Sequence, residues 1–167
     1  MVRWLAPIMC FTAEEIWAEL PGERAASVML SEFYELPAVG ELKVNWGDLL
    51  QVRTQVDKQL EAARNDGKIG SPLEAEVVVK VSGSVKSELE SLGDELRFVF
   101  ITSEARVEEG SGSLDGDIPV DVVASEHAKC TRCWHRRDDV GSVAGHEEVC
   151  GRCADNVDGA GEQRQFA

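Results

Sequence analysis

The spacing of apolar residues near the start of the chain predicts a helix in two parts over residues 4–20. Thr12-Ala-Glu-Glu15 has the form of a capping box, with Thr12 as the N-cap and Glu15 three residues later. An apolar stripe follows this box, and Pro21-Gly22 predicts the end of the helix. Residues 28–34 show no clear pattern, and Pro37-Ala-Val-Gly40 predicts a break.

A longer helix is predicted from about Leu42 to Asp66, with Gly67 as its C-cap. Apolar side chains recur there every three or four residues and give one continuous face. They are Trp46, Leu49, Val52, Val56, Leu60 and Ala63. Such a face favours helix packing over a ligand role.

The middle of the chain predicts a mixture of strands and helices. Ser71-Pro-Leu-Glu74 looks like a helix start, but a helix beginning there would enclose the β-branched run Val77–Val81, so a strand is favoured. Residues 85–93 predict a helix.

Two further strands are predicted, a buried one over Leu96–Ile101 and another over Ile118–Val123. The acidic, Gly- and Ser-rich segment Ser103–Asp117 between them predicts an exposed hairpin loop or connection. The expected fold class is α+β. We expect a helical domain over 1–70, a small α/β domain over 71–126 and a cysteine-bearing knuckle over 127–167.

Charge is distributed unevenly along the 167 residues, whose formal net charge is −14. The last segment, 127–167, is nearly neutral and holds all three histidines and five of the arginines. A strongly acidic surface repels phosphates, so this last quarter is the place where we expect any RNA contact. No apolar run approaches the ~20 residues that span a bilayer, and the first ten residues do not form a signal peptide. We therefore expect a cytoplasmic protein with no membrane contact.

Four cysteines in the last segment predict a zinc site. Their pattern is Cys130-x2-Cys133-x16-Cys150-x2-Cys153, and two CxxC turns at such a separation are typical of structural zinc. Four thiolates complete a tetrahedron and leave no position for water or substrate, so the predicted zinc is structural.

Other chemistries of these cysteines are less favoured but remain open. Disulfides are uncommon in the cytoplasm, a redox CxxC needs only one pair, and iron suits a four-thiolate site as well as zinc does. The three histidines, His127, His135 and His146, could replace a ligand, but four cysteines make this unnecessary. The fifth cysteine, Cys10, is expected in a core.

Cationic and aromatic residues follow the first cysteine pair closely. Arg132, Trp134, Arg136 and Arg137 could stack on an unpaired base and meet phosphate. Trp134 could equally well cover the small metal core. No GxGxxG or GxxxxGK[ST] motif and no nucleophile–base pair is present, so the residues by themselves indicate a binding module.

Several stretches resemble bacterial isoleucyl-tRNA synthetases. The most specific is the knuckle, with Ala128-Lys-Cys-Thr-Arg-Cys-Trp-His135 and Val149-Cys-Gly-Arg-Cys-Ala-Asp-Asn-Val157. Upstream, Arg3–Trp17, Val52–Lys58 and Lys68–Ala75 are similar to the family in the same order. The resemblance covers nearly the whole chain except residues 82–126.

The resemblance implies a C-terminal fragment of a class I ligase that joins isoleucine to tRNA(Ile) with ATP. Residues 1–70 would then be the end of a helical anticodon-binding bundle, and Arg132 and Trp134 would contact the anticodon region. The signatures of the nucleotide-binding and editing domains are missing, so we expect neither ATP binding nor catalysis from this chain, which would depend on the remainder of the synthetase.

Two alternatives share the cysteine spacing. Formamidopyrimidine-DNA glycosylases end in a similar finger, but they begin with a proline nucleophile followed by glutamate, whereas this chain begins Met1-Val2-Arg3. A free-standing zinc knuckle for protein contacts is the other, and the acidic charge favours it mildly.

Overall fold

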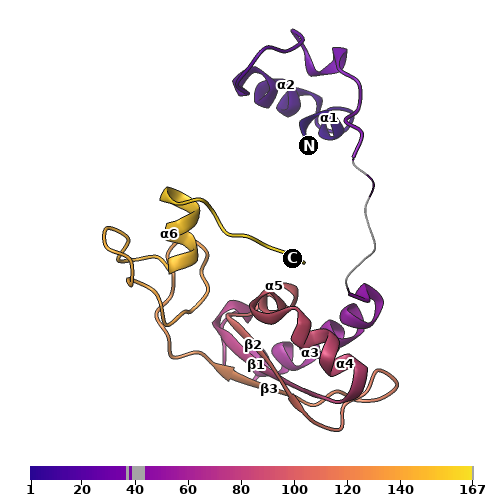
Figure 1. The fold of residues 1–167 in the computed structure, drawn as a ribbon, viewed down its shortest axis with the longest axis vertical. Helices are drawn as coiled ribbons and strands as arrows, with labels where there is room; N and C mark the ends of the chain where they lie inside the picture. The colour runs from indigo at the N-terminus through magenta and orange to yellow at the C-terminus, as the bar shows by residue number, and fades with distance from the viewer. Residues whose placement is uncertain (37, 39–43, 167) are drawn as a thin grey trace. The chain divides into compact units, whose positions relative to one another are not determined.

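The computed structural model describes residues 1–36, 38 and 44–166 (Figure 1). The chain forms two compact units, Met1–Leu42 and Lys43–Ala167. Within the described residues no helix is both long and apolar enough to cross a membrane. The expected boundaries at residues 70 and 126 remain predictions.

The first unit is a small helical assembly. It contains α1 (Val2–Leu5), α2 (Cys10–Glu19) and the 3-10 helix η1 (Val28–Leu30). Ala6, Ala13, Trp17 and Val28 are buried together, and the indole Nε1 of Trp17 donates a hydrogen bond to the carbonyl of Ala25 at 2.9 Å. Trp17 is therefore the largest buried side chain described in this unit.

The helix in two parts is present, but the predicted capping box is wrong. Helix α2 begins at Cys10, so Thr12 lies inside its first turn. The N–H of Ala13 donates to the carbonyl of Met9 at 2.8 Å, which closes that turn three residues earlier than the box would. The predicted break over Pro37–Gly40 lies, apart from Ala38, outside the described residues.

The second unit begins with the long helix α3 (Trp46–Asn65). Asn45 is its N-cap, and the side-chain oxygen accepts hydrogen bonds from the N–H groups of Gly47 and Asp48 at 3.0 and 3.4 Å. The helix thus starts later in the chain than the predicted start at about Leu42, a residue that lies outside the described part of the structure. It ends at Asn65 with Asp66 as its C-cap, one residue before the predicted end, and Gly67 follows with a φ of +72° that suits a glycine after a helix.

A three-stranded sheet packs with α3. The strands β1 (Ala75–Val81), β2 (Glu104–Glu109) and β3 (Val120–Ala124) are ordered β2-β1-β3. Central β1 runs parallel to β2, with Val79 opposite Val107, and antiparallel to β3, with Val79 also opposite Val120. Parallel neighbours need a crossover, which here contains α4 (Gly83–Ser91), η3 (Gly93–Glu95) and α5 (Leu96–Phe100).

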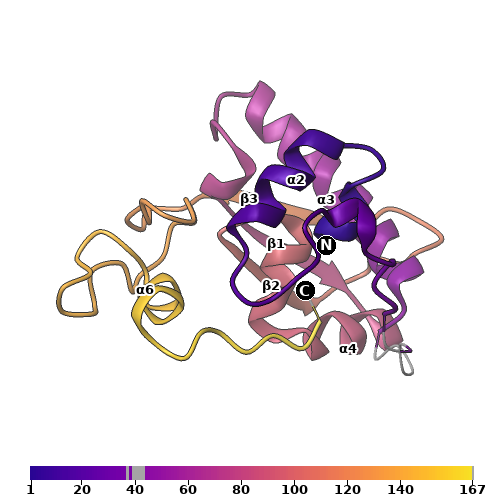
Figure 2. The same cartoon turned by 90° about the horizontal axis from the view of Figure 1, so that it is seen from above.

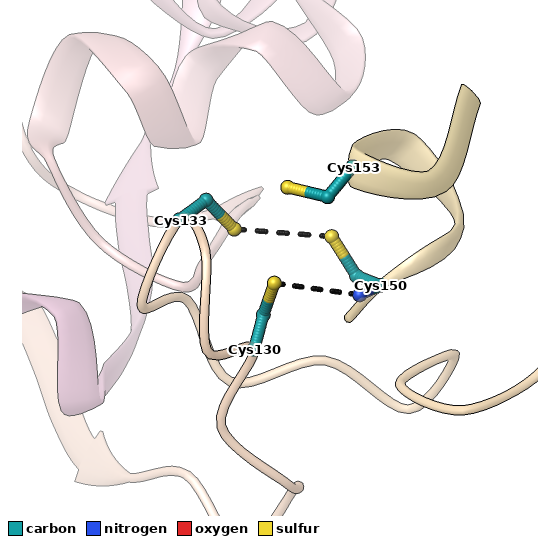
Figure 3. A group of neighbouring side chains, drawn as sticks. All are labelled: Cys130, Cys133, Cys150 and Cys153. Carbon is teal, nitrogen blue, oxygen red and sulfur yellow. Dashed lines mark hydrogen bonds between the residues drawn. The ribbon is translucent and has the colours of Figure 1, made fainter. Parts of the chain in front are cut away.

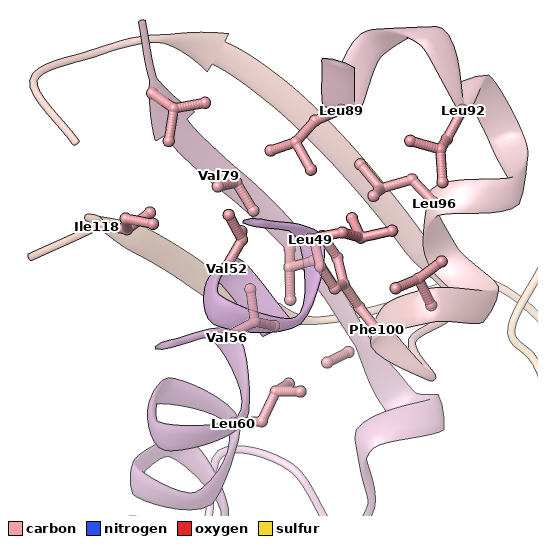
Figure 4. Close-up of a cluster of buried hydrophobic side chains, with 14 of the residues drawn as sticks. Leu49, Val52, Val56, Leu60, Val79, Leu89, Leu92, Leu96, Phe100 and Ile118 are labelled. Carbon is pink, nitrogen blue, oxygen red and sulfur yellow. The ribbon is translucent and has the colours of Figure 1, made fainter. Parts of the chain in front are cut away.

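One hydrophobic core joins these elements (Figure 4). The predicted apolar face of α3 supplies Leu49, Val52, Val56, Leu60 and Ala63, all buried. The alternate residues of β1 and the crossover residues Leu89, Leu96 and Phe100 face the same interior. The α+β class is therefore confirmed, and α3 shares its core with the sheet.

The prediction of a strand over Leu96–Ile101 is wrong, since these residues form α5. A short apolar run fits a buried strand and a buried helix equally well, and here it lies between two parallel strands, where the connection is usually helical. Ile101 ends the helix with a left-handed φ of 57°, an uncommon conformation for a β-branched residue.

The prediction of an exposed loop over Ser103–Asp117 is wrong in part. Its first half is the edge strand β2, in which Ala105 and Val107 alternate with charged residues and pack against the core. The acidic composition marks the outer face of an edge strand, which charged side chains protect from further pairing.

Candidate metal centre

The four cysteines approach one another from two separate turns (Figure 3). Cys130 and Cys133 lie on a turn in which the N–H of Trp134 donates to the carbonyl of Cys130 at 3.0 Å. Cys150 is the N-cap of α6 (Gly151–Asp158), and Cys153 lies in its first turn. Figures 1 and 2 show α6 set apart from the sheet of the same unit.

The geometry of the four sulfur atoms suits a tetrahedral ion. All four Sγ atoms lie within 4.8 Å of one another, and those of Cys133 and Cys150 are 3.8 Å apart. A tetrahedron with Zn–S bonds of ~2.3 Å has edges of roughly 3.8 Å. Cys130, Cys150 and Cys153 are buried, so the donors face a small interior that excludes water. The residues present therefore fit zinc.

The electrostatics of the cluster also suit a cation. Burial raises the pKa of Cys130, but backbone N–H groups, led by that of Cys133, outweigh it and lower this pKa to about 6. Burial and the neighbouring thiolates raise the pKa of Cys150 to about 12. Clustered thiolates thus repel one another, and a divalent cation at the centre removes that repulsion.

Hydrogen bonds to sulfur support the arrangement. The N–H of Cys150 donates to the Sγ of Cys130 at 3.4 Å, and the guanidinium of Arg132 donates to the Sγ of Cys153 at 3.7 Å. Donors of this kind orient metal ligands and offset the excess negative charge of four thiolates.

Within the described part of the chain, the cysteines alone form a group that could hold a metal, and the histidines lie elsewhere. His127 approaches Glu76 at 3.8 Å, and His146 contacts Asp158 at 2.7 Å. His135 is buried, with its Nδ1 3.2 Å from the carbonyl oxygen of Cys133. Burial, followed by the nearby charge of Arg97, lowers the pKa of His135.

Trp134 projects from the first turn into solvent. Its side chain is 59% exposed, and its backbone has a left-handed φ of 68°. The Nζ of exposed Lys129 lies 5.2 Å from the centroid of its ring. Exposed Arg132 lies on the same turn, so this surface, defined by Lys129, Arg132 and Trp134, offers an aromatic face and two cations.

Arg136 and Arg137 are instead held against the α/β part of the unit. The N–H of Arg136 donates to the Oγ of Ser103 at 2.6 Å, and its side chain approaches Glu74 at 4.0 Å. Arg137 pairs with Asp94 at 3.6 Å. The structure therefore separates the four predicted RNA-contact residues into an outward pair, Arg132 and Trp134, and an inward pair.

Sequence reasoning missed Lys129 and Phe98 as members of this region. Lys129 directly precedes the first cysteine, so its position was a usable signal. Phe98 lies within Leu96–Ile101, which the sequence pattern assigned to a buried strand, so its contact with the knuckle was not predicted. Its ring meets the ring of His135 edge-on at a centroid distance of 5.8 Å.

Two family models match the chain. Residues 1–79 match the anticodon-binding domain of tRNA ligase, and residues 129–156 match the zinc finger found in FPG and IleRS. A helical anticodon-binding region followed by a four-cysteine finger is a combination of the aminoacyl-tRNA synthetase class.

Comparisons over the full length of this chain indicate which synthetase within this class it resembles. The chain is 50% identical over 182 residues to the isoleucine–tRNA ligase of Alkalilimnicola ehrlichii, 51% over 180 residues to that of Aliivibrio fischeri strain MJ11, and 45% over 175 residues to that of Saccharophagus degradans. The matches cover 99–100% of this chain and 19% of each relative. The chain is thus a homologue of the C-terminal part of isoleucine–tRNA ligases, and this homology is favoured over the glycosylase and free-standing alternatives.

Proposed function

We propose that this chain is the tRNA-recognition part of an isoleucine–tRNA ligase. The observation that carries the proposal is full-length similarity to the part of these ligases that joins an anticodon-binding domain to a zinc finger. Its partners would be tRNA(Ile), at the anticodon region, and the remainder of the synthetase chain, in the cytoplasm.

The metal in this proposal is one structural zinc ion bound by Cys130, Cys133, Cys150 and Cys153. The closed set of four sulfur donors supports it, because no position remains for a substrate. Zinc supplies the cross-link between the two turns. The chain's own residues then present the surface of Lys129, Arg132 and Trp134.

Recognition would use stacking and charge at that surface. An unpaired base can stack on the exposed indole of Trp134, which contributes about 1–3 kcal/mol per base. Arg132 and Lys129 would meet phosphates, and their contribution falls as salt rises. Arg136 and Arg137 would act indirectly, by holding the knuckle in place.

Chemistry would belong to the rest of the ligase. We propose that the isolated chain neither binds ATP nor supports isoleucine-dependent exchange of pyrophosphate into ATP. Exchange that copurifies with the isolated chain would contradict this.

The test of recognition is made in a full-length ligase that carries this sequence. Arg132→Ala should raise the KM for tRNA several-fold, with an effect that shrinks at high salt, and leave pyrophosphate exchange unchanged. Because Arg132 also hydrogen-bonds the Sγ of Cys153, the variant must be shown to retain one zinc ion per chain. Arg106→Ala is the matched control, because Arg106 is an exposed arginine on β2 whose partner is Glu104. Equal effects of the two variants would mean that the knuckle makes no specific RNA contact.

A further inference from the structure

The knuckle meets the α/β core at the ring of Phe98. The guanidinium carbons of Arg97, Arg152 and Arg164 lie 4.3, 5.0 and 4.2 Å from the centroid of this ring. Arg152 belongs to α6, which bears the second cysteine pair, and Arg164 belongs to the segment after α6. His135, next to Trp134, meets the same ring edge-on. One aromatic side chain of α5 thus contacts both metal turns and the end of the chain.

Arg152 links this ring to the cysteines and to the end of the chain. Its guanidinium hydrogen-bonds both oxygens of Glu162, at 3.0 and 3.2 Å. Arg152 itself lies between Cys150 and Cys153 in the chain. Its side chain therefore joins the second metal turn to the final segment.

The final segment is itself attached to the core. The carboxylate of Glu95 in η3 accepts hydrogen bonds from the N–H groups of Gln165 and Phe166, both at 2.7 Å. Phe166 also packs against the main hydrophobic core. The chain thus runs from the core into the knuckle and then returns to the core. Phe98 lies where the knuckle and the final segment contact the core.

Phe98 also lines a cavity of about 470 Å³, and two carboxylates in the lining of this cavity each contact two arginines. Asp94 contacts both Arg97, at 2.7 Å, and Arg137, at 3.6 Å. Glu162 likewise contacts both Arg152 and Arg164. Because a carboxylate lies between each pair of arginines, the guanidinium groups already have anionic partners. These ion pairs therefore hold the knuckle and the final segment on the core.

We propose that Phe98 is a positioning residue that fixes the orientation of the knuckle on the α/β core, and thereby the direction in which Trp134 and Arg132 face the RNA. This inference rests on the proposed function of that surface. A cation beside an aromatic face is attracted by the ring quadrupole. An aliphatic side chain of similar size fills the space without this attraction, so Leu tests the π face and Tyr preserves it.

The experiment uses a full-length ligase that carries this sequence, with Phe98→Leu, Phe98→Tyr, Trp134→Ala and the double variant Phe98→Leu/Trp134→Ala. We expect Phe98→Leu to raise the KM for tRNA about tenfold, with one zinc ion retained per chain and with kcat and pyrophosphate exchange unchanged. Phe98→Tyr should restore the wild-type KM. Because Phe98 acts through the Trp134 surface, the KM for tRNA of the double variant should be no higher than that of the more impaired single variant.

Each outcome decides between the two proposals. If Trp134→Ala leaves the KM for tRNA unchanged while zinc is retained, the RNA role of the surface is wrong. If Trp134→Ala weakens tRNA use but Phe98→Leu does not, or if the two effects multiply in full, only the positioning role is overturned. Loss of zinc from Phe98→Leu also overturns it, since Phe98 would then maintain the metal site itself. Arg164→Gln removes one cation from the ring without altering the core, and it should raise the KM for tRNA in the same direction if Phe98→Leu fails to fold.

Discussion

The ammonium group of Lys129 lies 5.2 Å from the centre of the Trp134 ring, and Trp134 is more than half exposed. A tryptophan that covers a metal core would be buried by that core. Trp134 is instead exposed beside a cation, so the proposed RNA role of this residue can be separated from a structural role by experiment.

Trp134→Gly makes this separation. At φ +68° a glycine relieves up to about 1–2 kcal/mol of backbone strain, while loss of the contact with Lys129 costs only about 0.5–1 kcal/mol. The knuckle should therefore retain one zinc ion per chain and melt within a few degrees of wild type, whereas tRNA use should fall. A buried aromatic lid would lose about 3–5 kcal/mol on truncation, so release of zinc from this variant would support the lid.

Removal of the metal should unfold the knuckle before the core. Zinc binding contributes roughly 10–16 kcal/mol to the folding of zinc-finger peptides, and the metal turns have only a small apolar cluster of their own. After chelation, amide exchange should accelerate over residues 129–156 and remain slow in α3 and β1. Unchanged protection around the cysteines in metal-free protein would show that another interaction holds this segment.

Adjacent leucines of α3 should differ sharply in their effect on stability. Leu49 is 1% exposed and belongs to the main core, while Leu50 is 51% exposed. Leu49→Ala should cost about 2–5 kcal/mol of unfolding free energy, and Leu50→Ala should cost less than about 1 kcal/mol. Chemical denaturation of both variants measures the difference, and similar midpoints would contradict the packing of this helix.

The docking of the final segment on the core should weaken at acid pH because Glu162 becomes protonated. Arg164, aided by Arg152, lowers the pKa of this carboxyl from 4.5 to about 2. A carboxyl with a lowered pKa in the folded state stabilises that state above its unfolded pKa and loses this effect as pH falls from about 4.5 towards 2. Glu162→Gln should accordingly accelerate exchange at Gln165 and Phe166 at pH 7, and the two proteins should converge near pH 2. A constant difference across this range would assign the docking to other groups.

Periodicity and spacing were sufficient to predict the elements that depend on local signals. The apolar face of α3, the β-branched strand β1 and the cysteine cluster were all anticipated, because 3.6-residue repeats, β-branching and CxxC turns each act over a few residues. The cap at Asn45 carried a usable signal that was overlooked.

Long-range context decided the rest. Whether Leu96–Ile101 is a strand or a helix depends on the direction in which β2 pairs with β1, which no local pattern encodes. The same holds for the site, since the inward position of Arg137 depends on Asp94, a residue more than 40 positions away. The Phe98 contacts likewise join residues that are remote in sequence.

The position of β1 in the sheet also bears on the order in which this region folds during synthesis. The antiparallel partner of Val79 is Val120, about 40 residues later, and the parallel partner β2 must follow the whole helical crossover. A nascent chain that has just released β1 and α3 from the ribosome therefore has a central strand with both edges open. The core can close only when β3 emerges, and the cysteines follow it in the chain. We therefore expect metal capture by the cysteines to follow closure of the core during synthesis.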